Sequence, residues 1–188
     1  SASNEGSKTS PMLNLTDAVT AASTGDTIYI GAGTHQYSSA SNWNIPFDGS
    51  KTLVIKGAGR DATILDAQQK HRHFYFSANS NNSLLDTTFK IMDLTMKNGR
   101  PQTNDNGGSI YMHGYQVSNY GYKGHSPLFQ NVLFQSNQPK FSTNDYSKNG
   151  GAVYAARSNP SFRDVTFKYN TSTREGGGIY IYDVDNNK

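Results

Sequence analysis

The sequence predicts an all-β solenoid, in which short strands stack coil upon coil beside a capping helix. Three observations predict this class. The segment SPLFQNVLFQSN at 126–137 recurs as NPSFRDVTFKYN at 159–170. A second motif occurs three times, as GGSIY, GGAVY and GGGIY, and such internal periods are typical of solenoids and propellers. Aromatic residues make up 12% of the chain, which separates it from disordered polar sequences.

The first third of the chain is expected to supply the cap and the opening coils. LTDAVTAAS at 15–23 has helical apolar spacing and an acidic residue in its first turn. GDTIYIGAGTH, KTLVIKGAGR and ATILDAQ then read as short strands separated by glycine-containing turns. One helix before a series of strands is typical of a solenoid cap. We therefore expect one domain over 1–188, or a fragment of a longer solenoid, with a cap region (1–26), first coils (27–99) and repeat coils (100–188).

Both repeated motifs are expected to form strands that end at tight corners. Strict alternation in the copy at 159–170 places Phe162 and Asp164 on one face, and Val165 and Phe167 on the other. The doubled glycines suit a corner that requires positive φ before the next strand.

Asn98, Asn137 and Asn170 end the three copies of the first motif, the earliest of which is one residue shorter. Equivalent residues of successive coils would lie about 4.8 Å apart. Side-chain amides at that spacing can hydrogen-bond in a ladder, and asparagine tolerates a left-handed corner. We assign these three residues a structural role.

The order of these segments resembles two known groups of proteins. The helix followed by GDTIYIGAGTH, TLVIKGAG and TILDAQ resembles the opening coils of right-handed parallel β-helix proteins of the pectin-lyase-like class. FQSN and FKYN, paired with the three GG motifs, are similar to the FxxN and GGA[ILV] repeats of bacterial polymorphic outer membrane proteins. Ser109 and Gly178 replace the usual alanine. The resemblance touches most of 15–182 and implies a right-handed parallel β-helix used in adhesion outside the cell.

Composition excludes several other classes. The net charge is +3, but the basic residues are scattered, so no nucleic-acid footprint is expected. The chain has no cysteine, which excludes a disulfide framework. No apolar run is long enough to span a bilayer.

Catalysis would require a cluster of acidic residues on one outer face, with a cationic clamp for the substrate. Asp93 and Asp164 occupy equivalent repeat positions, which favours a role in turns. Arg157, Arg163 and Arg174 are candidate clamps without a visible acid pair. The sequence therefore favours a non-enzymatic protein, and we assign no catalytic residue and no cofactor.

Two segments contain residue types that can bind metal ions. His71 and His73 would share a face of a strand, but no third ligand is evident, and a solvent-facing strand is the expected alternative. Residues 183–187, DVDNN, match the start of a calcium loop without its glycine and distal glutamate. We assign no metal ligand.

The strongest candidates for ligand or partner contact are tyrosines. Tyr111, Tyr154 and Tyr180 fill one position of the three GG motifs, and Tyr182 lies two residues beyond. If the neighbouring aliphatic residues point inward, these rings form a column outside, suited to sugars or a protein partner. The alternative is that the rings only stack on one another under the loop at 114–125.

These patterns predict a non-enzymatic extracellular or cell-surface module that acts in adhesion, or as a stalk or filament subunit. The rival is a polysaccharide-binding or polysaccharide-cleaving protein. The expected partner is a protein or glycan on another cell or matrix, or a neighbouring subunit stacked end to end, with no nucleic acid and no membrane span. Asn14, Asn81 and Asn170 lie in glycosylation sequons, and sugar on Asn170 would contradict its assignment to the ladder.

Overall fold

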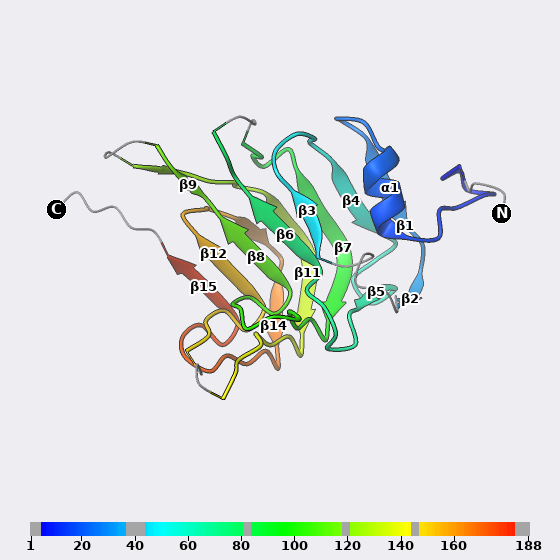
Figure 1. Cartoon of the computed structure of the whole chain (residues 1–188). Coiled ribbons are helices and arrows are strands. Elements are labelled where there is room, and N and C mark those ends of the chain that lie inside the picture. The colour runs from blue at the N-terminus through cyan, green and yellow to red at the C-terminus, as the bar shows by residue number, and fades with distance from the viewer. Residues whose placement is uncertain (1–4, 37–43, 81–83, 118–120, 144–146, 183–188) are drawn as a thin grey trace.

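The protein is all-β, with mostly parallel sheets and one short helix in the part of the chain that is described. The computed structural model describes residues 5–36, 44–80, 84–117, 121–143 and 147–182. The strands form two layers (Figure 1), and helix α1 (Leu15–Ala21) lies at the end formed by β1 and β4. The predicted all-β class and N-terminal helix are confirmed.

Two parallel sheets contain almost all of the strands. The strands of the five-stranded sheet are β3 (Ile45–Phe47), β6 (Phe74–Ser77), β8 (Ile110–His113), β12 (Val153–Ala156) and β15 (Ile179–Tyr182). Those of the eight-stranded sheet are β1 (Thr27–Ile30), β2 (Gly33–His35), β4 (Val54–Gly57), β5 (Thr63–Asp66), β7 (Lys90–Lys97), β11 (Leu128–Gln135), β13 (Ser161–Arg163) and β14 (Thr166–Lys168). An antiparallel pair, β9 (Tyr115–Gln116) and β10 (Tyr122–Lys123), lies outside both.

The repeated segments lie side by side in register. Phe134 of β11 is paired with Met96 of β7 and with Phe167 of β14. From β3 onward the chain passes alternately between the five-stranded and eight-stranded sheets. Equivalent residues of successive repeats therefore become neighbours across parallel strands.

The core lies between the two sheets and is largely aromatic and aliphatic. Phe134 and Phe167 stack with ring centroids 5.0 Å apart. Phe76 and Phe89 make an edge contact at 5.6 Å, and both are fully buried. Stacking of like residues thus continues into the core, where burial of apolar surface stabilises the sheets.

The expectation of strict alternation within the first motif is wrong, because a left-handed residue interrupts it. Asp93, Asn131 and Asp164 have φ values of 58°, 51° and 53°. Each reverses the side-chain order, so Phe162 and Phe167 face the same side and their rings meet at 5.8 Å. A residue at positive φ acts here like a bulge in the strand.

The corners before β8, β12 and β15 use the doubled glycines as predicted. Gly107, Gly150 and Gly176 have φ values of 65°, 70° and 66°. A Cβ atom at Gly107 would overlap the carbonyl oxygen of Ile110. Both the backbone conformation and the space therefore require glycine.

Candidate functional site

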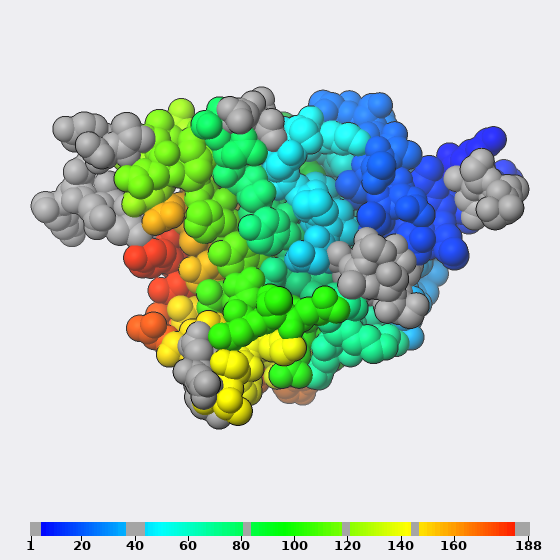
Figure 2. Space-filling model, in the orientation of Figure 1, coloured from blue at the N-terminus to red at the C-terminus, as the bar shows by residue number. Residues whose placement is uncertain are grey.

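Four stacked tyrosines run across the outer face of the five-stranded sheet. The rings of Tyr75, Tyr111, Tyr154 and Tyr180 follow one another with centroid separations of 5.3, 5.2 and 5.6 Å. Their planes are inclined by 2°, 23° and 11° in the same order. We call these four residues the tyrosine strip. Figure 2 views the same side of the molecule, where successive strands appear as adjoining colour bands.

Local sequence explains why the tyrosines point outward. Ile110 and Met112 flank Tyr111 in β8 and are fully buried, so the alternation of the strand turns Tyr111 away from the core. The in-register pairing of β6, β8, β12 and β15 then places one ring on each strand. The four strip tyrosines are half-buried.

The predicted set of contact residues differs from the strip in two places. Tyr75 belongs to the strip but lies in the sequence FYFS, without a GG motif that would have revealed it. Tyr182 is 42% exposed and pairs in register with Ala156, one column away. Its ring still lies 6.2 Å from that of Tyr180.

Burial and neighbouring groups raise the pKa of the two central strip phenols, those of Tyr111 and Tyr154. Burial, followed by the nearby carboxylate of Asp105, raises the pKa of Tyr111 to about 12. Burial and the neighbouring Tyr180 also raise the pKa of Tyr154. The Arg72 guanidinium lies 5.0 Å from the Tyr111 ring centroid, a cation–π distance. The strip thus presents neutral hydroxyl groups beside a buried cation.

The segment His71–His73 is buried, so the expectation of a solvent-facing strand is wrong. These residues precede β6, and His73 is fully buried. Its Nε2 donates to the carbonyl of Leu65 at 3.0 Å, which leaves Nδ1 to accept from the Ser109 hydroxyl at 2.9 Å. Burial lowers the pKa of His73 to about 4. Among the described residues no group of three metal-ligating side chains occurs, and 183–187 lie outside them.

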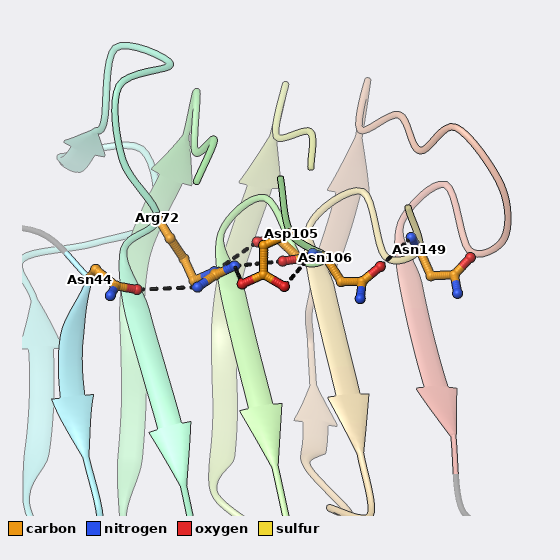
Figure 3. Close-up of polar contacts among 6 residues, drawn as sticks. Asn44, Arg72, Asp105, Asn106 and Asn149 are labelled. Carbon is orange, nitrogen blue, oxygen red and sulfur yellow. Dashed lines mark hydrogen bonds and ion pairs between the residues drawn. The ribbon is translucent and has the colours of Figure 1, made fainter. Parts of the chain in front are cut away.

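Arg72 joins three successive corners in one hydrogen-bond network (Figure 3). Its guanidinium donates to the carbonyl oxygens of Gly107 at 2.9 Å and Asn106 at 2.6 Å. It also binds the carboxylate of Asp105 at 2.8 Å and the amide oxygen of Asn44 at 3.3 Å. These hydrogen bonds and the ion pair compensate the buried charge of Arg72. They also hold together the corners that precede β3, β6 and β8.

The same corners carry a second amide ladder, which sequence reasoning missed. The side-chain oxygen of Asn106 accepts from the backbone N–H of Asn149 at 2.8 Å. The oxygen of Asn149 accepts in turn from the N–H of Glu175 at 3.0 Å. Each residue directly precedes a GG motif, so the strings NGGSIY and NGGAVY contained the signal.

The asparagines that end the first motif form a ladder of two. Asn137 is fully buried, and its Nδ2 donates to Asn170 Oδ1 at 2.9 Å and to the Met96 carbonyl at 3.1 Å. Its Oδ1 accepts from the Gly99 N–H at 2.7 Å. Asn170 Nδ2 donates to the carbonyl of Phe134 at 2.9 Å. The Asn170 amide is therefore engaged inside the turn.

Asn98 does not belong to this ladder. It precedes Gly99, which takes the position of Asn137 in its coil, and its Nδ2 donates to Asp66 at 2.8 Å. Asn98, Ser136 and Tyr169 have φ values of 54°, 53° and 57°. The left-handed residue of each corner thus lies one position before the ladder position. Because the first copy of the motif is one residue shorter, Asn98 takes the left-handed position and Gly99 takes the ladder position.

The other sequence candidates lie apart from one another. The Arg157 guanidinium lies 4.0 Å from the ring centroid of Tyr122, so the β9–β10 pair packs at the carboxyl end of β12. Arg174 forms an exposed ion pair with Glu175 at 3.6 Å, and Arg163 is exposed. Asn131 Nδ2 donates to Asp93 at 2.8 Å, in keeping with the predicted turn role of this position. Asn81 lies outside the described residues.

The final repeat contains β14, the GGG corner and β15, with Phe167, Asn170 and Tyr180 in the positions described above. Residues 164–182 match the Chlamydia polymorphic membrane protein repeat. This match covers one repeat unit and includes the last residue of the strip. No curated protein and no solved structure matches the chain significantly. Within the described ranges, no helix has the length and apolar character needed to cross a membrane.

Proposed function

We propose that the protein is a right-handed parallel β-helix displayed at a cell surface, where the tyrosine strip forms an adhesive contact with a protein or glycan of another cell or matrix. The observation that carries the proposal is the strip itself. Stacked aromatic rings that remain half-exposed on a flat sheet offer apolar area and hydroxyl groups together.

Strand order supports the β-helical part of the proposal. The chain alternates between two parallel sheets, and each pass pairs with the equivalent pass of the previous repeat. Parallel crossovers of this kind are almost always right-handed. In a β-helix, equivalent positions of successive coils lie next to each other. A repeated sequence therefore stacks like residues, which explains the columns of Tyr, Phe and Asn.

The repeat match supports the location. The Chlamydia polymorphic membrane proteins are an outer-membrane, surface-exposed family, and one of their repeats is matched at 164–182. The columns of stacked residues also suit a stiff scaffold that holds a contact surface away from its anchor.

Engineered disulfides test the β-helical register, because the natural chain has no cysteine. Gln130 and Arg163 are register partners on adjacent strands, and such partners lie about 4.8 Å apart, within disulfide reach. Gln130→Cys with Arg163→Cys should form a cross-link that peptide mapping identifies. The control pair Gln130→Cys with Lys168→Cys is out of register and should keep free thiols. Equal cross-linking in both pairs would contradict the register.

Removal of the central strip rings tests the adhesive role. Tyr111→Ala with Tyr154→Ala should reduce binding of protein-coated beads to cultured cells, or binding to a glycan array, by about tenfold or more. Tyr29→Ala with Tyr169→Ala is the matched control, because these two rings are 75% and 72% exposed and lie outside the strip. If the folded strip variant binds as the unaltered protein does, the strip is scaffolding and the proposal fails.

A stalk or filament role is the second candidate, and the last described rung favours it. Within the described residues, β15 pairs with β12 and β14 pairs with β11, and neither has a second partner strand. Phe167 and Ile179 are buried only in part there. We propose that a second copy stacks on this edge. Light scattering should then show a mass that rises with concentration, whereas the mass of one chain throughout would contradict stacking.

A further inference from the structure

A polar cleft lies at the corners between the two sheets, apart from the tyrosine strip. Its volume is about 530 Å³, and it opens to solvent. Three consecutive corners contribute to it: those between β5 and β6, between β7 and β8, and between β11 and β12. In Figure 2 these corners adjoin at the lower edge of the molecule. The lining residues are Gln69, Lys70, His71, Arg100, Pro101, Gln102 and Lys140.

The described residues that line the cleft carry positive charge and include no acidic side chain. Lys70, Arg100 and Lys140 each come from a different corner. Lys70 Nζ donates to the side-chain oxygen of Gln68 at 3.0 Å, and Lys140 Nζ donates to the carbonyl of Gln102. Both partners are neutral, and neither ammonium group forms an ion pair with a carboxylate of the described residues. In the neighbouring corner network, the carboxylate of Asp105 is held by Arg72.

One side chain of the cleft, Arg100, has a buried nitrogen that lacks a hydrogen-bond partner. The Nε of Arg100 is buried without a hydrogen-bond partner, and its guanidinium forms no ion pair with any described residue. His71 also lines the cleft and is only 6% exposed. Burial and the charge of Lys70 lower the pKa of His71, in agreement with a positive potential in the cleft. A buried donor without a partner, such as Arg100 Nε, is costly unless a ligand accepts from it.

We propose that this cleft binds the carboxylate or sulfate groups of an acidic oligosaccharide. Three cations from separate corners fit several anionic groups along one chain, and Arg100 can hold a carboxylate or sulfate with two parallel hydrogen bonds. The exposed amides of Gln69 and Gln102 are suited to sugar hydroxyl groups. The volume lies in the usual range for small ligands.

Other polyanions fit the cleft less well. A single-stranded nucleic acid needs aromatic platforms for its bases, and the described lining residues include no Phe, Tyr or Trp. A duplex needs an extended basic surface, and the net charge of the chain is only +3. An anionic membrane needs exposed apolar residues beside the cations, and among the described lining residues the one apolar side chain, Pro101, is buried.

Calorimetric titration of the full chain tests the proposal with three probes at fixed ionic strength. The probes are a sulfated heparin hexasaccharide, a carboxylate-only oligogalacturonide and a neutral dextran oligosaccharide. At least one acidic probe should bind with an affinity that falls as salt rises, and dextran should not bind. Binding of the sulfated probe alone or of the oligogalacturonide alone supports the proposal and identifies the anionic group. Absence of binding by both, or equal binding of dextran, overturns it.

Paired variants locate the binding. Arg100→Gln with Lys140→Gln should weaken the affinity for the acidic probe about tenfold or more, because two cationic contacts are lost. Lys8→Gln with Lys168→Gln removes the same charge from exposed positions elsewhere and should change the affinity less than about twofold. Equal losses in the two variants would overturn the proposal. The variant Tyr111→Ala with Tyr154→Ala should retain this binding, so a failure of the adhesive strip and a failure of the cleft are distinguishable.

Discussion

The side-chain amide of Asn137 donates to Oδ1 of Asn170 at 2.9 Å, although the two residues lie in different repeats of the chain. The same Asn170 oxygen accepts from the backbone N–H of Asn137 at 2.9 Å. The contact therefore joins side chain and backbone of successive turns. Because this turn is buried, these hydrogen bonds satisfy polar groups that water cannot reach. They also connect two successive copies of the repeated segment.

Asn137→Ala is expected to lower the free energy of unfolding by about 3 kcal/mol, because the Gly99 N–H and the Met96 carbonyl would be left buried without a partner. Urea denaturation followed by circular dichroism measures the change. Asn159→Ala, at an exposed asparagine, should change it by less than about 0.5 kcal/mol. Similar losses in both variants would show that burial of Asn137 is not the cause.

Gly151→Ala is expected to destabilise the protein by about 3 kcal/mol or more, because a Cβ atom there would overlap the carbonyl oxygen of Gly177 on the next coil. The backbone of Gly151 is not left-handed, so the effect is steric. Gly31→Ala is the matched control, since a Cβ atom at Gly31 meets nothing within 4 Å. Thermal melting compares the two variants, and a Gly151→Ala melting temperature equal to that of Gly31→Ala would contradict close packing of these coils.

Arg72→Met is expected to lower the free energy of unfolding by about 3 to 5 kcal/mol, because it leaves the Asp105 carboxylate and the Gly107 carbonyl without their donor. The control is Arg174→Met, which breaks an exposed ion pair and should cost less than about 1 kcal/mol. Denaturation in urea measures both. A small loss for Arg72→Met would mean that the corners keep their structure without the guanidinium.

His73 is expected to make stability fall as pH drops from about 6.5 to 4. Its pKa is about 4 in the folded protein and near 6.5 when unfolded. The unfolded chain therefore binds the proton first, and stability is full above pH 6.5 and declines towards pH 4. The total loss is on the order of 3 kcal/mol.

The measurement is urea unfolding at several pH values between 7 and 4. His73→Gln should show a shallower slope than the unaltered chain. The slope should not vanish, because burial also lowers the pKa of His71, His113 and His125. If the slope in His73→Gln is unchanged, His73 is not the main cause of the pH dependence of stability.

Much of the local structure could be predicted from the printed residues. The strands of the repeats, the helix at 15–21 and the left-handed glycines follow from alternation, helical spacing and glycine doublets. The outward position of Tyr111, Tyr154 and Tyr180 follows from the aliphatic residues beside them. These features depend on neighbours in sequence, which is why local patterns reveal them.

Other features escaped prediction because they depend on register between coils. The one-residue difference before Asn98 decides that Gly99, not Asn98, meets Asn137. Left-handed Asp164 reverses the order of side chains that alternation predicts. Nothing beside Arg72 in the chain indicates that Asp105 would neutralise it.

By itself, the sequence determined which segments repeat, which residues form strands and which corners require glycine, because these are properties of short stretches of backbone. Only the tertiary structure decided that Tyr75 joins the tyrosine strip, that Arg72 is buried and paired, and that three cations from separate corners line one cleft. Those outcomes depend on how far each coil is offset from the next, and the offset is set by packing across the whole core.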